Sequence, residues 1–438
     1  MLSMIGLIAA LTLLIYATLR GVNIIVAALL SSLVLALTSG INPNTALSDH
    51  YMSGFAGYFA DWFLVFLLGA IFGKVIQDTR SAASIADWIS RCLGPDWALF
   101  AVVAACAVMT YGGVSLFVVG FTVYPIAVSL FRVADYPHRF IPAALVFGSV
   151  SFTMTSPGSP EIQNIIPTEF FGTTPTAGGW IGVFIGLLIL TVGGLWLRTL
   201  LQRAVRLGEG FELPAESPLR SDGVGEEGET STDLPKPLFA LLPLGVVLLV
   251  LNVLAQFIDS KSAVLAALVL GIMSAWALNL RFVTGFFRPM GTGTQNALVA
   301  IANTCAVVGF GSVAAETPAF DTFLEILFNL AGPPLMGLAI FVTVICGITG
   351  SASGGLGIAL PIVAPDYMAQ GVDPGAMHRV SALASGGIDS LPHNGYVVTT
   401  IRAISGETHK RAYMPIFLVG TLLPTAALGL AVALFLVF

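Results

Sequence analysis

Two ionisable side chains interrupt an apolar helix near the C-terminal end of the chain. The stretch ASGGIDSLPHNGYVV (384–398) places Asp389 and His393 beside Ser390 and Asn394, with apolar sequence on both sides. A carboxylate and an imidazole could bind and release a proton near neutral pH. The glycines and the proline uncouple the helical hydrogen bonds, and the freed N–H groups attract anions. The stretch therefore predicts a site for a proton, an anion or both.

Three further interruptions combine glycine or proline with small polar residues. They are TYGGVS (110–115), TSPGSPEIQN (155–164) and GSASGG (350–355). Hydroxyl, amide and glycine N–H groups can bind hydroxyls and carboxylates, which makes candidates of Ser156, Gly158, Gln163, Gly355 and Ser390. Glu161 joins Asp389 and His393 as a candidate proton-coupling residue. The alternative is structural: Asp389 caps a half-helix, His393 bonds a carbonyl group and Glu161 faces outer solvent.

The composition identifies an integral membrane protein. Of the 438 residues, 56% are hydrophobic and only 10% are charged, whereas soluble domains carry about 25% charged residues. The net charge of −6 comes without a basic stripe, which excludes a nucleic-acid partner. The four cysteines are scattered without metal-ligand spacing, so we expect neither a metal site nor a cofactor.

Hydrophobic runs near the ~20 residues needed to cross a bilayer recur along the chain. We predict spanning helices at 2–18, 22–39, 58–77, 140–170 (broken), 177–198, 237–258, 262–280, 295–315, 376–404 (broken) and 411–436. The segment 204–236 is acidic and rich in Gly, Pro, Ser and Glu, which predicts a flexible linker. It separates membrane domains at 1–203 and 237–438.

The two halves repeat. GKVIQDT (73–79) matches GSVAAET (311–317), and the dipeptide HR at 138–139 returns at 378–379, at nearly the same offset. Five spans in each half would turn the second half upside down, giving inverted repeats. In the segments 97–131 and 334–368, a polar tip divides the apolar sequence into two arms, and each arm is too short to cross the bilayer. We therefore expect one re-entrant hairpin in each half. The predicted fold is an all-α polytopic membrane protein.

The basic residues orient this topology. With the N-terminus outside, 16 of the 18 Lys and Arg residues fall on the cytoplasmic side, and only Lys261 and Arg379 fall outside. Both termini are then periplasmic, and 204–236 is cytoplasmic.

Inverted repeats with paired broken helices are typical of secondary transporters. The four interruptions contain no Lys or Arg, which favours a small hydroxylated monocarboxylate over a polyanion. Because an inside-negative potential opposes anion entry by about 2.3 kcal/mol per 100 mV, carrying a proton along makes entry electroneutral. Sodium coupling stays open, since Ser, Asn and backbone oxygens also bind Na⁺. An intramembrane serine protease using SASGG and His393 is disfavoured, because a protease needs no second half, and a channel is disfavoured as well.

Three stretches resemble the gluconate permease (GntP) family of proton symporters, within the wider ion transporter superfamily. They are YGGVSLFVVGFTVYPIAVSLFR (111–132), SPGSPEIQNIIPTEFFGTTP (156–175) and ALASGGIDSLPHNGYVVT (382–399). The resemblance implies proton-coupled uptake of gluconate, another sugar acid, hydroxybutyrate or D-serine across the bacterial inner membrane, by a homodimer. SASGGLGIALP is closer to the hydroxybutyrate-permease-like branch. The implied binding residues are Gly112, Gly113, Ser115, Ser159, Asn164, Ser351, Ser353, Gly354, Asp389, His393 and Asn394.

Overall fold

The computed structural model describes residues 2–20, 22–217, 233–283, 285–328, 332–392 and 394–438. All regular structure within these ranges is helical, which confirms the predicted fold class. In the described part of the chain, seven helices are long and apolar enough to cross a membrane: Pro43–Asp78, Leu116–Val133, Gly179–Arg206, Pro237–Leu254, Ser260–Leu278, Phe287–Ala315 and His409–Val437. Shorter apolar helices lie at Leu2–Thr18, Ile24–Ser39, Ala98–Tyr111 and Pro334–Gly347. The protein is therefore a multi-pass membrane protein.

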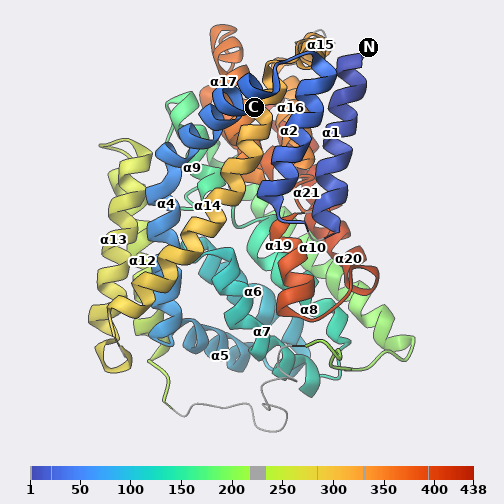
Figure 1. Ribbon diagram of the computed structural model, residues 1–438. Helices are drawn as coiled ribbons and strands as arrows, with labels where there is room; N and C mark the ends of the chain where they lie inside the picture. Colours follow the sequence, from blue (N-terminus) through green and yellow to red (C-terminus); the bar gives the residue numbers. More distant parts are fainter. Residues whose placement is uncertain (1, 21, 218–232, 284, 329–331, 393) are drawn as a thin grey trace.

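A similar order of helices occurs twice along the chain, except that the short α3 occurs only in the first series and the last helix is divided into α20 and α21 in the second (Figure 1). The first series is α1 (Leu2–Leu19), α2 (Ile24–Ser39), α3 (Pro43–Thr45), α4 (Met52–Asp78), α5 (Ser81–Leu93), α6 (Ala98–Tyr111), α7 (Leu116–Val133), α8 (Ile141–Val146), α9 (Ile162–Phe171) and α10 (Gly179–Arg206). The second is α12 (Pro237–Leu254), α13 (Ser260–Leu278), α14 (Phe287–Ala315), α15 (Pro318–Phe328), α16 (Pro334–Thr349), α17 (Ala352–Ala369), α18 (Pro374–Ser385), α19 (Gly395–Val398), α20 (His409–Ile416) and α21 (Leu423–Val437). Single π-helical turns extend α8 to Ser151 and α19 to Ile404, and another joins α20 to α21. Each predicted span overlaps one or two of these helices.

Two amphipathic helices were not predicted. α5 buries Ala82, Ile85, Ala86 and Ile89, which share one face of the helix, while Asp87 and Arg91 form an ion pair on the exposed side. α15 occupies the same place in the second half, after α14 and before the second hairpin. Figure 1 shows α5 at the lower end of the molecule and α15 at the upper end.

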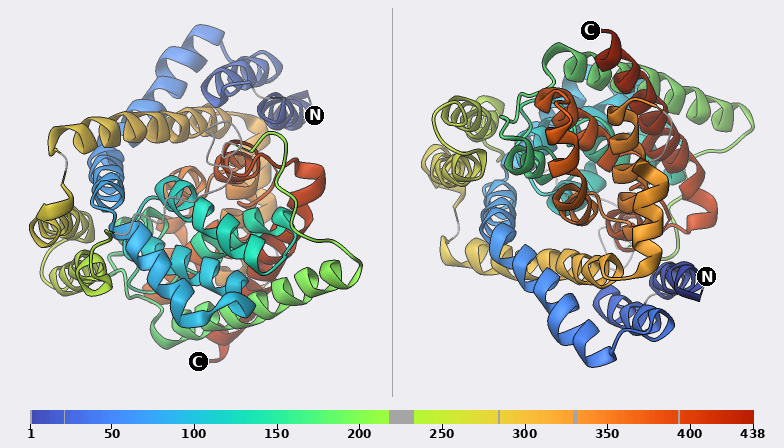
Figure 2. Two further views of the ribbon diagram at one scale, coloured as in Figure 1. Left: turned by 90° about the horizontal axis from the view of Figure 1, so that it is seen from below. Right: turned by 90° about the horizontal axis from the view of Figure 1, so that it is seen from above.

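The helices form two groups. α1, α2, α4, α12, α13 and α14 pack on one another, with α4 lying along α14; we call them the frame helices. α6 to α10 and α16 to α21 form the second group, the core helices. Figure 2 shows α14 crossing the molecule between α1 and α2 on one side and the core helices on the other. Because α5 and α15 each connect a frame helix to a hairpin, they join the two groups at opposite ends of the molecule.

Both described ends of the predicted linker contact the helices. α10 continues to Arg206, and residues 207–217 then lie against the core helices, whereas 233–236 lie against α5. The contacts are Arg139 with Glu209 (2.6 Å), Tyr124 Oη with Ser217 Oγ (2.9 Å) and Ser84 Oγ with the Pro235 carbonyl (2.6 Å). The prediction of a flexible linker over 204–236 therefore does not hold for its two described ends. Its middle part, 218–232, lies outside the described residues.

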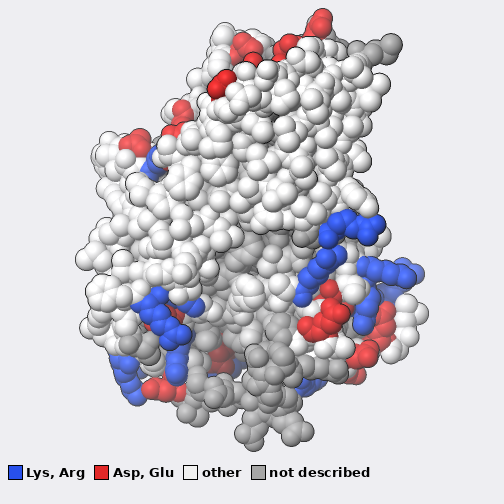
Figure 3. Space-filling model, in the orientation of Figure 1, with Lys and Arg blue, Asp and Glu red and all other residues white. Residues whose placement is uncertain are grey.

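The charged side chains are unevenly distributed on the face seen in Figure 3. Most of the Lys and Arg seen lie over the lower half, together with some Asp and Glu, whereas the upper end carries mainly Asp and Glu, and a broad uncharged surface lies between. The asymmetry follows the positive-inside pattern if the lower end, with α5, is cytoplasmic.

Candidate functional site

The second broken helix is joined to the second hairpin by one amide side chain. Asn394 caps α19, since its Oδ1 accepts from the Val397 N–H at 2.9 Å. Its Nδ2 donates to the Gly350 carbonyl at the hairpin tip (3.0 Å) and to Asp389 Oδ1 (2.9 Å). Asp389 is only 4% exposed. The structure thus brings two predicted site residues into one hydrogen-bonded unit with the tip, while His393 lies outside the described residues.

The tip of the second hairpin is held by a cap and a close helix contact. Gly350 has a left-handed backbone (φ 61°), and Ser351 Oγ accepts from the Gly354 N–H at 3.2 Å. Ser353 is buried. A Cβ atom on Gly355 would lie 2.6 Å from Cys346 Cα, so this glycine is required where α17 approaches α16. Gly355 therefore has a packing role within the predicted site.

The tip of the first hairpin lies against the first broken helix and the frame. Tyr111 Oη donates to the Pro157 carbonyl at 2.5 Å. Gly113 adopts φ 90°, and a Cβ there would lie 3.2 Å from Pro160. A Cβ on Gly112 would lie 2.5 Å from Leu244 of α12. The N-terminal end of α7 at Ser115 borders Gly73 of α4. This tip therefore contacts both groups of helices.

The first break is organised by a buried asparagine. Asn164 is fully buried, and its Nδ2 donates to the carbonyl groups of Ser159 (2.8 Å) and Pro175 (2.9 Å). Asn252 of α12 donates to the Gly158 carbonyl at 3.1 Å. Ser156 Oγ donates to the carbonyl of Phe152 in the preceding turn. The half-buried Glu161 is the residue that precedes α9.

Two predicted site residues offer unused polar atoms. Ser390 Oγ and Gln163 Oε1 are buried and have no hydrogen-bond partner among the described residues. A buried polar atom without a partner is costly, so a ligand group that bonds it would be stabilising.

Sequence reasoning missed a buried basic pair. Arg379 was predicted on the outer face, but it is fully buried inside the core helices. Its guanidinium donates to the carbonyl groups of Ala177 (2.7 and 3.0 Å), Pro175 (3.1 Å) and, in the first break, Thr155. The neighbouring His378 contacts Asn164 Oδ1 (3.2 Å) and Thr173 Oγ1 (2.6 Å). The interruptions contain no Lys or Arg, yet α18 of the second half places Arg379 against the first break. The HR dipeptide, which occurs at 138–139 and again at 378–379, was the sequence signal that could have drawn attention to this pair.

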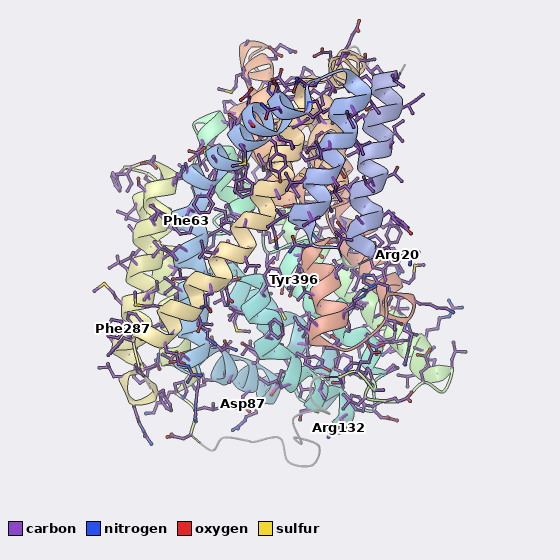
Figure 4. The ribbon with its side chains drawn as sticks, viewed as in Figure 1. Arg20, Phe63, Asp87, Arg132, Phe287 and Tyr396 are labelled. Atoms are coloured by element: carbon purple, nitrogen blue, oxygen red, sulfur yellow. The ribbon has the colours of Figure 1, made fainter. Side chains whose placement is uncertain are left out.

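The two broken helices also touch directly. Tyr396 Oη of α19 donates to Ser149 Oγ at 3.4 Å, and its ring meets Phe117 of α7 edge-on at 5.5 Å. A Cβ on Gly386 would lie 3.2 Å from Thr155 Cγ2. Figure 4 shows Tyr396 near the middle of the molecule, with Asp87 and Arg132 at the lower end. Each tip lies beside the break of its own half, and the two broken helices contact each other.

A cavity of about 550 Å³ lies beside the first break, between the core helices and α12. Its lining is mostly apolar, with Tyr111, Thr153 and Ser156 as its hydroxyl groups. Of the predicted binding residues that the structure describes, only Ser156 lines it.

The chain is similar to a protein family, to a bacterial transporter and to a solved transporter structure. The family described as GntP family permease matches residues 1–306. An uncharacterized transporter of Bacillus subtilis (strain 168), YxjC, is 36% identical over 468 aligned positions, which cover 99% of this chain and 98% of that protein. The crystal structure of the Alcanivorax borkumensis YdaH transporter has a similar fold, with a TM-score of 0.58 at 19% identity over 90% of this chain and 89% of that one.

Proposed function

Because the chain belongs to the GntP permease family and is therefore a secondary transporter, we propose that it carries a small hydroxylated monocarboxylate into the cell together with a proton. The observation that carries this proposal is the unit formed by Asp389, Asn394 and the Gly350 carbonyl. It places a buried carboxyl group, which can gain or lose a proton, at a hairpin tip lined by hydroxyl groups. A proton bound there would offset the negative charge of the substrate.

The substrate would lie between the two tips and the two breaks. Its carboxylate would bind N–H groups freed at the breaks, and its hydroxyl would bond unused atoms such as Ser390 Oγ and Gln163 Oε1. A short acid with one or two hydroxyl groups, such as hydroxybutyrate, matches this small number of polar partners better than gluconate does. Glu161 and His393 remain proposed proton-coupling residues beside Asp389.

Alternating access would come from relative movement of the frame and core helices. We propose that the halves are inverted repeats; the opposite placement of α5 and α15 supports this (Figure 1). The basic lower end supports a cytoplasmic linker and periplasmic termini in a bacterial inner membrane (Figure 3). A homodimer is part of the same proposal.

Sodium symport is the second candidate. The Gly350 carbonyl and the Asp389 carboxylate both accept hydrogen bonds from Asn394 Nδ2, so these two oxygen atoms lie close together. Oxygen atoms of these two kinds are the ligands that Na⁺ uses at broken helices. The family match to transporters does not support the alternative function of an intramembrane serine protease.

Accumulation in liposomes tests the proposal. With gluconate, 3-hydroxybutyrate and glycerate as probes, an inward proton gradient without sodium should drive accumulation of at least one acid. Dependence on a sodium gradient alone would replace proton by sodium coupling. Binding of none of the acids, measured by thermal shift on purified protein, would contradict the substrate class.

A further inference from the structure

The HR dipeptide is used differently in the two halves. In the first half both residues pair with acids: His138 Nδ1 lies 2.9 Å from Glu407, and Arg139 makes a two-pronged ion pair with Glu209. In the second half His378 and Arg379 contact only a hydroxyl, an amide and backbone carbonyl groups. Within the described ranges, no carboxylate forms an ion pair with either of them.

This leaves a buried positive charge without a negative partner. An arginine side chain stays protonated in proteins, and buried charges are normally paired because leaving water is costly. The carbonyl dipoles around Arg379 stabilise it, but they bring no net negative charge. Its Nη1 atom has two N–H groups and, among the described residues, one acceptor, the Thr155 carbonyl at the start of the first break. The uncompensated charge therefore lies directly behind one wall of the proposed site.

We propose that Arg379 selects anionic substrates, with the carboxylate of the transported molecule as its missing counter-charge. This inference rests on the proposed function. Arg379 acts through the first break. It fixes Thr155 and the 175–177 loop, and its charge favours an anion held by the N–H groups of Ile162 and Gln163 in the first turn of α9, which are unused among the described residues. For two unit charges about 10 Å apart in a medium of effective dielectric constant about 20, Coulomb attraction corresponds to an affinity gain on the order of tenfold, which is the size of effect we expect from Arg379.

Charge selection can be separated from a purely structural role by comparing acids with their neutral amides. Binding of 3-hydroxybutyrate and gluconate is measured beside 3-hydroxybutyramide and gluconamide, at constant pH. Arg379→Gln should weaken acid binding at least tenfold and leave amide binding unchanged, whereas Arg379→Lys should retain part of the preference. Arg139→Gln is the matched control, because the charge of Arg139 is already neutralised by Glu209, and it should bind the acids like the wild type.

A second pair of variants leaves Arg379 in place. Thr173→Asp would put a carboxylate beside His378, as Glu407 stands beside His138. When binding is measured at an alkaline pH that keeps the imidazole neutral, the new carboxylate lowers the local charge by one. Acid binding should weaken several-fold in Thr173→Asp and not in the neutral Thr173→Asn. This comparison decides the question if Arg379→Gln does not fold.

The two proposals fail in different ways. If the wild type binds no acid, the substrate class and this inference are both wrong. If the wild type binds acids, but neither Arg379→Gln nor Thr173→Asp weakens that binding relative to the amides, only the inference is overturned.

Discussion

Asn394→Ala should disrupt the contact between the second hairpin and the second broken helix. The side chain makes three hydrogen bonds: it accepts from Val397 N–H and donates to the Gly350 carbonyl and to Asp389. Alanine cannot replace any of them. The tip at Gly350 would lose its direct link to the break, so both stability and substrate affinity should fall.

The magnitude follows from the three bonds. Loss of the cap costs about 1 kcal/mol, and loss of the bond to the neutral carbonyl costs about 1 kcal/mol. A bond to a carboxylate contributes about 1.5–3 kcal/mol when that group is ionised. Because water entering the space left by the amide would restore part of this, we expect a loss of about 2–4 kcal/mol. At about 2 °C per kcal/mol for a large chain, the melting temperature should fall by about 4–8 °C.

Thermal unfolding in detergent and equilibrium binding of 3-hydroxybutyrate measure the two effects. Asn23→Ala is the control, since Asn23 caps α2 through one exposed bond to Ile25 N–H and does nothing else in the described structure. Its melting temperature should fall by about 2 °C or less. If Asn394→Ala melts like Asn23→Ala and binds like the wild type, the amide does not join tip and break, and the reasoning is wrong.

Three shorter predictions concern other parts of the molecule. Gly355→Ala should lower the free energy of unfolding by about 1–3 kcal/mol, because its Cβ atom would lie 2.6 Å from the α16 backbone. Gly354→Ala should cost less stability and mainly lower substrate affinity, because its Cβ atom would lie 3.1 Å from a serine hydroxyl. The reverse order of stabilities, measured by thermal unfolding, would contradict this packing. Hydrogen bonding to its arginine partner holds the pKa of the partly exposed Glu209 below its usual value of 4.5. The attachment of residues 207–217 to Arg139 is therefore complete above pH 4.5 and weakens as the pH falls through the lowered pKa of Glu209. Hydrogen exchange of this segment, corrected for its intrinsic pH dependence, should rise only in acid. Glu209→Gln should abolish this pH dependence. Exposed Cys92 on α5 should resist an impermeant maleimide in intact cells and react in inside-out vesicles; labelling in cells would reverse the proposed orientation.

Local signals predicted most of the helices and the places where they break. Hydropathy over about 20 residues is a property of the segment itself, so the spans could be located within several residues. Glycine and proline beside Ser, Thr or Asn break a helix through their own backbone chemistry, which is why the interruptions at 110–115 and 350–355 were predicted at the positions where α6 and α16 end. The short amphipathic helices α5 and α15 escaped notice because each fills a stretch between apolar runs that are far more hydrophobic.

The burial of Arg379 could not be predicted in this way. Counting basic residues assumes that each lies in water at the end of a span. The groups that satisfy Arg379 are the carbonyls of Thr155, Pro175 and Ala177, more than 200 positions earlier in the chain. Only the fold brings them together, so a residue assigned to the outer surface is buried beside the proposed site.

The repeated HR dipeptide links the two halves in both directions. His138 of the first half holds Glu407, which follows the second broken helix, and His378 of the second half holds Thr173, which follows the first. Each half therefore fixes the end of the broken helix that belongs to the other. Because both breaks also touch at Tyr396 and Ser149, a movement of one transmits force to the other. The proposed proton symport would need this property: if the break proposed to bind the proton and the break proposed to bind the anion moved separately, either could cross alone and the gradient would be dissipated.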